Sequence, residues 1–262
     1  AVIKRLMSDR PIGSLLSGGL DSSLITGIVA GEFKKRGKGK LRTFVISIGN
    51  GPDLAYARKV ADYIGSDHHE IILTEKEFLK AIMEVIYNIE SYDTTTVRAS
   101  VGNYLVAKYI KQNTDVTVVY NGDGSDEQSG YIYLANAPST DAFQHELERL
   151  LSEISFFDVL RSDRSVSSHW SLEARTPFLD KDFVQYYMSI DPKLKMYSEG
   201  DKIEKYLLRR AFADEKIIPD EVLWRRKEAF SDGCSDKARS WHTIISEHVN
   251  EIYSDEEFEA RV

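Results

Sequence analysis

Ser17-Gly18-Gly19-Leu20-Asp21-Ser22-Ser23 lies between a short apolar run at 12–16 and a segment with apolar residues at helical spacing. The run has the length of a buried strand, and the spacing of Leu24, Ile25, Ile28 and Val29 predicts a helix. A glycine-rich turn between a strand and a helix can bind phosphate, because backbone N–H groups and the positive end of the helix dipole face the anion. We therefore predict that a phosphate-bearing ligand is bound by Ser17, Gly18, Gly19, Asp21, Ser22 and Ser23.

Asp21 is the unusual member of this turn, because a carboxylate repels phosphate unless a cation lies between them. Its natural partner is a bridging Mg²⁺. No lysine follows the second glycine, so the turn is not the phosphate loop that ends in Gly-Lys-Ser/Thr. The alternative interpretation is an ordinary helix start, in which Asp21 and Ser22 cap backbone N–H groups.

Length and composition set the class of protein. The 262 residues are 42% apolar and 29% charged, as in ordinary globular proteins. No apolar run approaches the roughly 20 residues that a membrane span needs, and a net charge of −8 argues against a nucleic-acid partner. The single cysteine, Cys234, excludes an internal disulfide and suits a reducing compartment. We expect a cytoplasmic protein with no membrane partner.

Apolar strand patterns alternate with helical patterns over the first half of the chain. Strands are expected at 12–16, 42–48, 69–73 and 116–120, with helices between them, which predicts a doubly wound, mainly parallel α/β sheet. A second acidic, glycine-containing turn, 121–127, follows the last of these strands. Ligands of such sheets gather at the carboxyl ends of the strands, where both turns lie. Beyond about residue 138 the pattern becomes mainly helical, and we expect one domain over 1–262.

Several further motifs follow in a fixed order. They are Glu90-Ser91-Tyr92-Asp93-Thr94-Thr95-Thr96-Val97-Arg98, Gly122-Asp123-Gly124-Ser125-Asp126-Glu127, Leu172-Glu173-Ala174-Arg175-Thr176-Pro177, Lys202-Ile203-Glu204-Lys205 and Arg226-Lys227-Glu228-Ala229-Phe230-Ser231-Asp232-Gly233. Together with the first loop, this series resembles the synthetase domain of the asparagine synthetase family. That family belongs to the ATP pyrophosphatases with a Ser-Gly-Gly-x-Asp-Ser loop. The resemblance covers nearly the whole chain and implies an adenine nucleotide α-hydrolase-like fold.

The resemblance implies a ligase reaction that uses ATP, Mg²⁺, aspartate and ammonia. The aspartate side chain attacks the α-phosphorus of ATP, which gives β-aspartyl-AMP and pyrophosphate, and ammonia then displaces AMP to form asparagine. The implied roles are Mg²⁺ binding by Asp21 and Asp126, nucleotide binding by Gly122, aspartate binding by Thr95, Thr96 and Arg98, and catalysis by Asp123 and Lys202.

Two of these assignments also have a non-functional interpretation. Lys202 could be a solvated lysine on a polar turn, and the threonine segment could be an exposed β-branched stretch with a surface arginine.

The chain departs from the family pattern at several places, among them a spacing one residue short between Glu127 and Gly130, a short turn at 49–52, and two substitutions. Asp123 replaces the usual glutamate, which is thought to handle the incoming ammonia, and Trp170-Ser171 stand where a glycine usually precedes Leu172. The family's glutaminase domain is absent from 1–262, so we expect ammonia as the direct donor and glutamine only with such a domain in a longer parent chain. A β-lactam-forming synthetase and a non-catalytic nucleotide-binding relative are the rival interpretations. A homodimer is left open.

Overall fold

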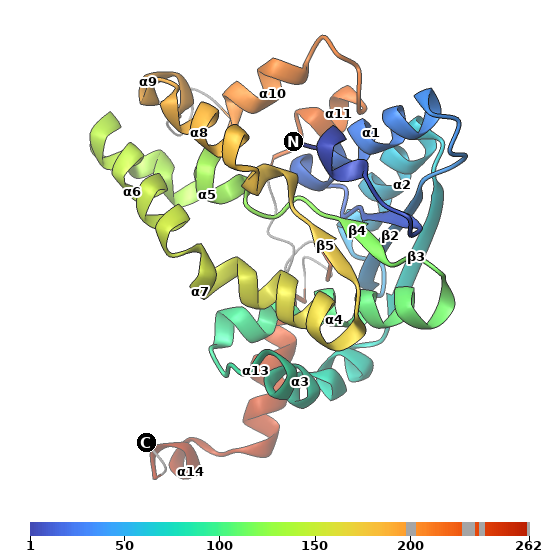
Figure 1. Ribbon diagram of the computed structural model, residues 1–262. Coiled ribbons are helices and arrows are strands. Elements are labelled where there is room, and N and C mark those ends of the chain that lie inside the picture. Colours follow the sequence, from blue (N-terminus) through green and yellow to red (C-terminus); the bar gives the residue numbers. More distant parts are fainter. Residues whose placement is uncertain (198–202, 227–233, 236–238, 261–262) are drawn as a thin grey trace.

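The computed structural model describes residues 1–197, 203–226, 234–235 and 239–260 (Figure 1). One predicted catalytic residue, Lys202, lies outside these ranges.

Five parallel strands form the centre of the molecule. They are β1 (Ile12–Leu15), β2 (Arg42–Ile48), β3 (Asp67–Leu73), β4 (Val118–Tyr120) and β5 (Glu173–Arg175). The strand order is β3-β2-β1-β4-β5, and every neighbouring pair is parallel. The chain progresses in one direction from β1 to β3 and in the other from β1 to β5. The crevice beyond the carboxyl ends of β1 and β4 is therefore the point at which sheets of this kind bind ligands.

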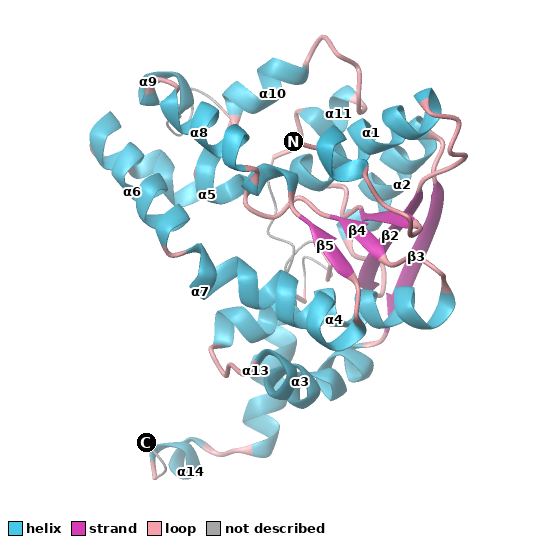
Figure 2. Ribbon diagram, viewed as in Figure 1, coloured by secondary structure: helices cyan, strands magenta, loops and turns pink. Residues whose placement is uncertain are grey.

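Helices cover both faces of the sheet (Figures 1 and 2). One face carries α1 (Leu20–Lys35), α2 (Pro52–Ile64), α10 (Tyr206–Phe212) and α11 (Asp220–Leu223). The other carries α3 (Glu75–Ile89), α4 (Thr94–Asn113) and α13 (Trp241–Ile252). The side chains of β2 alternate between the two cores, with Val45 in the first and Phe44 and Ile46 in the second. A strand that is buried on both faces carries consecutive apolar residues, and this explains the run from Phe44 to Ile46 in β2.

Local sequence sets the ends of several helices. At α3, the hydroxyl of Thr74 accepts a hydrogen bond from the Glu77 N–H (3.3 Å), and the Glu77 carboxylate accepts one from the Thr74 N–H (2.8 Å). At α2, Pro52 opens the helix and Gly65 closes it with a φ of 67°. These signals are short-range, so the sequence alone contains them.

The second half of the chain is mainly helical, as predicted. The short helix α5 (Ser125–Ser129) precedes it. Besides α10, α11 and α13, this half contains α6 (Thr140–Ser152), α7 (Ile154–Val159), α8 (Lys181–Ser189), α9 (Pro192–Lys195) and α14 (Asp255–Glu259). A separate apolar cluster that includes Phe143 and Leu147 holds α6 against the turn after α5. The chain then returns to the sheet, where the Cys234 carbonyl accepts hydrogen bonds from the Ile48 N–H (2.7 Å) and the Ser47 hydroxyl (3.0 Å).

The doubly wound parallel sheet is confirmed, and the structure adds β5 at its edge. The sequence does not indicate this strand, because its three residues, Glu173, Ala174 and Arg175, carry no apolar run. Just before it, Ser171 adopts a φ of 53°, in the left-handed region that favours glycine. A glycine at this point in the family pattern therefore has a physical reason. Among the described residues, no helix is long and apolar enough to cross a membrane.

Candidate active site

A cavity of about 670 Å³ opens at the carboxyl ends of β1, β2 and β4. Four parts of the chain that are distant in sequence meet there: the loop after β1, the turn after β4, the start of α4 and the segment from Lys205 to Arg226. The predicted site residues that line it are Ser17, Gly19, Asp21, Ser22, Thr95, Arg98, Gly122, Asp123 and Asp126. The structure thus brings both acidic turns and the threonine–arginine segment to one cavity.

The loop after β1 leaves the start of α1 open toward the cavity. The hydroxyls of Ser17 and Ser22 are 2.9 Å apart, and the Ser17 N–H donates to Ser22 Oγ at 3.2 Å. Gly19 occupies the N-cap, and no side chain caps the helix. The first N–H groups of this 16-residue helix have no partner within the helix itself, so they are available to an anion.

Two glycines are required by close backbone contacts. Gly18 has a φ of 77°, and a Cβ there would lie 2.5 Å from the backbone nitrogen of Ala57 in α2. A Cβ on Gly122 would lie 2.6 Å from the backbone nitrogen of Ser22. Any side chain at either position would push the loop away from its neighbour. Gly18 and Gly122 therefore shape the site through packing.

Three of the predicted site residues do not line the cavity. Gly18 faces α2, as described above, and Ser23 is fully buried within α1. Thr96 is 6% exposed, and its N–H donates to the Asp93 carboxylate (2.7 Å) that caps α4. One turn of a helix presents neighbouring residues in different directions, so only part of each motif can face a ligand.

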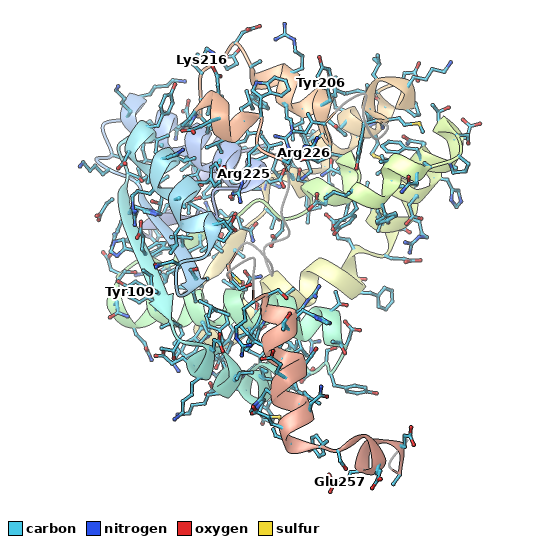
Figure 3. All side chains as sticks on the ribbon, turned by 180° about the vertical axis from the view of Figure 1, so that it is seen from behind. Tyr109, Tyr206, Lys216, Arg225, Arg226 and Glu257 are labelled. Carbon is cyan, nitrogen blue, oxygen red and sulfur yellow. The ribbon has the colours of Figure 1, made fainter. Side chains whose placement is uncertain are left out.

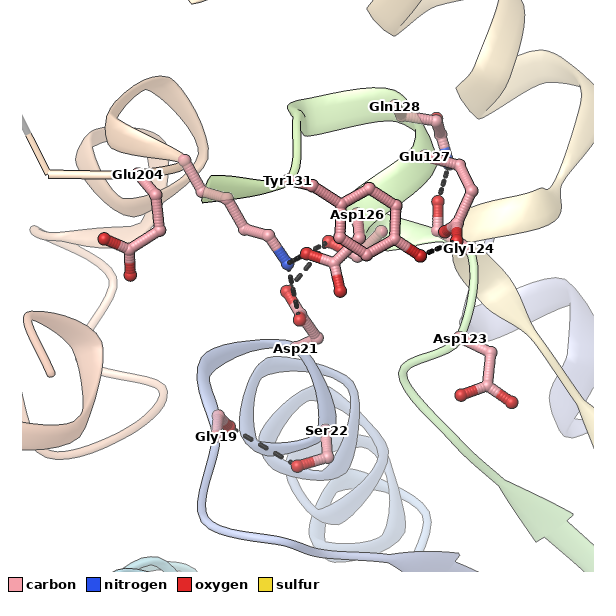
Figure 4. A network of polar contacts seen from close by, with 12 residues as sticks. Gly19, Asp21, Ser22, Asp123, Gly124, Asp126, Glu127, Gln128, Tyr131 and Glu204 are labelled. Atoms are coloured by element: carbon pink, nitrogen blue, oxygen red, sulfur yellow. Dashed lines mark hydrogen bonds and ion pairs between the residues drawn. The ribbon is translucent and has the colours of Figure 1, made fainter. Parts of the chain in front are cut away.

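The cation at the centre of the site is Lys205, which the sequence analysis did not select. Its Nζ lies 2.6 Å from Asp21 Oδ2 and 2.7 Å from Asp126 Oδ1 (Figure 4). The Ser125 hydroxyl completes the cluster, since it donates to Asp21 Oδ1 (2.8 Å) and lies 3.3 Å from the lysine nitrogen. Lysine thus occupies the place between the two carboxylates where a shared Mg²⁺ was predicted.

Electrostatics keep this lysine charged. Burial lowers the pKa of Lys205, but the attraction of the Asp126 and Asp21 carboxylates outweighs burial, and the net pKa is raised above its usual 10.5. Its side chain is 1% exposed, whereas those of Asp21 and Asp126 are about one-fifth exposed. The carboxylates therefore keep a face toward the cavity, and the ammonium, which also lines the cavity, is almost fully enclosed by its partners.

The donor set fits a Mg²⁺ that arrives with a nucleotide. Magnesium takes oxygen ligands, commonly one or two carboxylates together with phosphate and water oxygens. Asp21 and Asp126 line the same cavity and converge on one point, which meets that requirement. Within the described ranges, no group of three or more His, Cys, Asp or Glu side chains could hold a metal unaided. A bound Mg²⁺ has to share the two carboxylates with Lys205.

Arg98 brings a second positive charge to the cavity, from the start of α4. Its Nε is buried and has no hydrogen-bond partner among the described residues. The indole of Trp241 in α13 donates to its backbone carbonyl (3.1 Å), which fixes this turn of α4. An uncommitted guanidinium can grip a carboxylate with two parallel hydrogen bonds. The exposed Thr95 lies one turn earlier on the same cavity wall.

Comparison with known proteins identifies the family. The sequence profile described as "Asparagine synthase" matches residues 1–141 and 128–261. This chain belongs to the asparagine synthase family.

Two curated relatives are both named "Asparagine synthetase [glutamine-hydrolyzing]". The Cricetulus griseus protein is 50% identical over 258 residues, which are 98% of this chain and 46% of that protein. The Homo sapiens protein is 51% identical over 257 residues, which are 97% of this chain and 45% of that protein. The chain thus spans about half the length of these relatives. An NAD⁺ synthetase from Burkholderia pseudomallei covers 96% of this chain, but its TM-score of 0.33 at 11% identity is too low to bear on the fold.

Asp123 lines the cavity from the turn after β4, at the position where the family resemblance leads us to expect a glutamate. The amide of Asn121 donates to its carboxylate at 2.7 Å, and the Asp123 N–H lies 3.4 Å from the Asn121 side-chain oxygen. In Figure 4 its carboxylate stands apart from the Asp21–Asp126 cluster. Asp123 therefore faces the cavity from a position separate from the cluster of Asp21, Lys205 and Asp126.

The asparagine synthase motifs contained a signal for one of the residues that sequence reasoning missed. Lys205 belongs to the same motif as Lys202; the structure places Lys205 against Asp21, and Lys202 lies outside the described residues. Arg225 and Asp53 gave no signal of their own. Both side chains are less than one-tenth exposed, and both line the cavity. Arg225 Nη2 lies 2.8 Å from Asp53 Oδ1.

Proposed function

We propose that this asparagine synthase chain activates aspartate with ATP and transfers ammonia to it, forming asparagine, AMP and pyrophosphate. The observation that carries the proposal is the content of one cavity. It combines an open helix N-terminus, the Lys205 ammonium between two carboxylates, and the unpartnered Nε of Arg98. Joining two anions requires positive charge at the phosphates and separate recognition of the amino acid.

The roles follow from where each group lies. Backbone N–H groups of the loop after β1 and the first turn of α1 hold the β- and γ-phosphates. Lys205 meets charge that develops on the phosphoryl oxygens, the part that the sequence had assigned to Lys202. A Mg²⁺ bound at Asp21 and Asp126 would neutralise phosphate charge. Arg98 and Thr95 orient aspartate so that its side-chain carboxylate faces the α-phosphorus, and Asp123 accepts a proton from the ammonia that attacks the acyl carbon.

The nitrogen donor of residues 1–262 is proposed to be free ammonia. The named relatives are glutamine-hydrolysing proteins of about twice this length, so glutamine use is assigned to a glutaminase domain in a longer parent chain. Residues 1–262 are proposed to act as one unit, because Lys205 completes a site that begins at Ser17. The buried free thiol of Cys234 supports a cytoplasmic location. A homodimer stays a prediction that light scattering can test.

A pyrophosphate-release assay tests the function. Purified chain is supplied with ATP, Mg²⁺ and aspartate, with ammonium chloride or glutamine as nitrogen donor, and asparagine, AMP and pyrophosphate are measured. Aspartate-dependent pyrophosphate release, and asparagine only with ammonium, support the proposal. Pyrophosphate release without any amide product indicates a different acceptor, such as the internal amine of a β-lactam-forming enzyme. No release indicates a non-catalytic relative. Asp21→Ala, which removes one of the paired carboxylates, should abolish AMP formation in a folded protein.

A further inference from the structure

Arg225 ties together the loop after β1 and the start of α2. Its Nη1 donates to the carbonyl oxygen of Gly18 at 3.1 Å, and its Nη2 donates to Asp53 Oδ1 at 2.8 Å. The guanidinium carbon lies 3.9 Å from the centre of the Tyr56 ring. Figure 3 labels Arg225 beside Arg226 near the middle of the molecule. Three different contacts thus hold one buried side chain against two elements.

The charge of Arg225 is already paired within the protein. Its side chain is 8% exposed and that of Asp53 is 7% exposed. Asp53 and Tyr56 are three residues apart in the first turns of α2, so they lie on one face of that helix. The planar guanidinium can donate to a carbonyl and a carboxylate while it stacks on a ring, and an ammonium cannot do all three.

The peptide between Gly18 and Gly19 is the part of the loop that turns most easily. It has no side chain on either flank, and glycine tolerates both signs of φ. Its carbonyl and its N–H point in opposite directions, since the peptide is planar and trans. Its N–H makes only a long hydrogen bond, 3.4 Å, to the Ser17 hydroxyl. The bond from Arg225 to the carbonyl is therefore the shorter of the two hydrogen bonds that orient this peptide, beside the packing of Gly18 against α2.

An unrestrained peptide would present its carbonyl oxygen to a bound anion in a fraction of molecules. Held on Arg225, that oxygen faces a cation, and the N–H keeps its opposite direction. We infer that Arg225 is a positioning residue, which locks the Gly18–Gly19 peptide in the orientation that binds the pyrophosphate portion of ATP. The inference rests on the proposed function and concerns the loop rather than the chemistry.

Binding of inorganic pyrophosphate in the presence of Mg²⁺ tests the inference directly, by calorimetry on the full chain. Arg225→Lys keeps the charge but cannot keep both hydrogen bonds, so the pyrophosphate Kd should rise about tenfold or more. Asp53→Asn leaves Arg225 in place but weakens the charged hydrogen bond that holds it, so the pyrophosphate Kd should also rise, by about threefold. The KM for aspartate should stay within about twofold in both variants, because no restraint on α4 has changed.

Arg58→Lys is the matched control. Arg58 lies on the same helix and forms a bidentate pair with Glu70, at 2.8 and 2.6 Å, away from the cavity. Its replacement should leave pyrophosphate affinity unchanged.

Three results would overturn the inference. Unchanged affinity in Arg225→Lys would show that charge alone matters at this position. Tighter binding in Asp53→Asn would show that Arg225 is a direct phosphate ligand that Asp53 restrains. A parallel rise in the KM for aspartate would indicate general loss of structure.

If Arg225→Lys does not fold, the pyrophosphate affinity of Asp53→Asn alone decides. Absence of pyrophosphate binding and release in the unaltered chain would overturn the proposed function as well, and unchanged variants beside a binding wild type would overturn this inference only.

Discussion

Replacing Lys205 with methionine should both destabilise the chain and stop adenylation. The substitution removes an ammonium that lies 2.6 and 2.7 Å from two carboxylates and leaves those charges facing each other. Breaking a buried ion pair by removing one partner costs about 3–5 kcal/mol. For a chain of this size, that loss corresponds to a fall in Tm of roughly 6–20 °C.

Lys195 provides the matched control, because it is a second buried lysine in a different environment. Its side chain is 1% exposed, and its Nζ donates to Gln144 Oε1 at 2.9 Å and to the Tyr187 carbonyl at 3.3 Å. No ion pair to a described carboxylate holds it. Burial lowers its pKa. Lys195→Met should therefore change the free energy of unfolding by about 1 kcal/mol or less.

The assay combines urea denaturation, followed by tryptophan fluorescence, with ATP–pyrophosphate exchange at a temperature where both variants are folded. Lys205→Met should lose exchange, and added Mg²⁺ should recover part of its stability, because a divalent cation can replace the ammonium between Asp21 and Asp126. Lys195→Met should retain exchange. Equal destabilisation of the two variants, or normal exchange in Lys205→Met, would refute the reasoning.

Four further outcomes are expected. Arg98→Leu should raise the KM for aspartate by roughly 30-fold or more in steady-state kinetics while the KM for ATP stays nearly constant, and a parallel rise would move Arg98 to the nucleotide site. Asp123→Glu extends the side chain by about one methylene, and a misplacement of about 1 Å at a reacting centre can lower the rate on the order of a hundredfold. The variant should therefore speed asparagine formation more than pyrophosphate release, and equal effects in the two assays would contradict this. Ser171→Gly should raise the free energy of unfolding by about 1 kcal/mol, because it relieves a left-handed φ, and a loss in urea denaturation would disprove the strain. At pH values between the lowered pKa of Lys195 in the folded chain and the 10.5 of a free lysine, the unfolded chain binds more protons at this residue than the folded chain does. The free energy of unfolding should therefore rise with pH in this range, and urea denaturation of Lys195→Met should lack the rise.

Local sequence determined the elements and much of the site. The order of the first four strands and of the helices between them follows from hydrophobic spacing, and the ends of α2 and α3 follow from Pro52, Gly65 and the Thr74–Glu77 box. Parallel strands place their carboxyl ends at one edge, so the two acidic turns could be expected to meet there, and Asp21 and Asp126 do. Each of these inferences needs only contacts between residues near in sequence or a general rule of parallel sheets.

Only the tertiary structure decided which side chains face one another. Ser23 and Thr96 belong to the right motifs, but the phase of their helices turns them into the protein. Lys205 and Asp21 are 184 positions apart, and Arg225 and Gly18 are 207 apart. The packing of α10 and α11 against α1 brings these pairs together. That packing minimises the free energy of the whole chain, so no local pattern could have shown that Lys205 meets Asp21 or that Arg225 holds the loop.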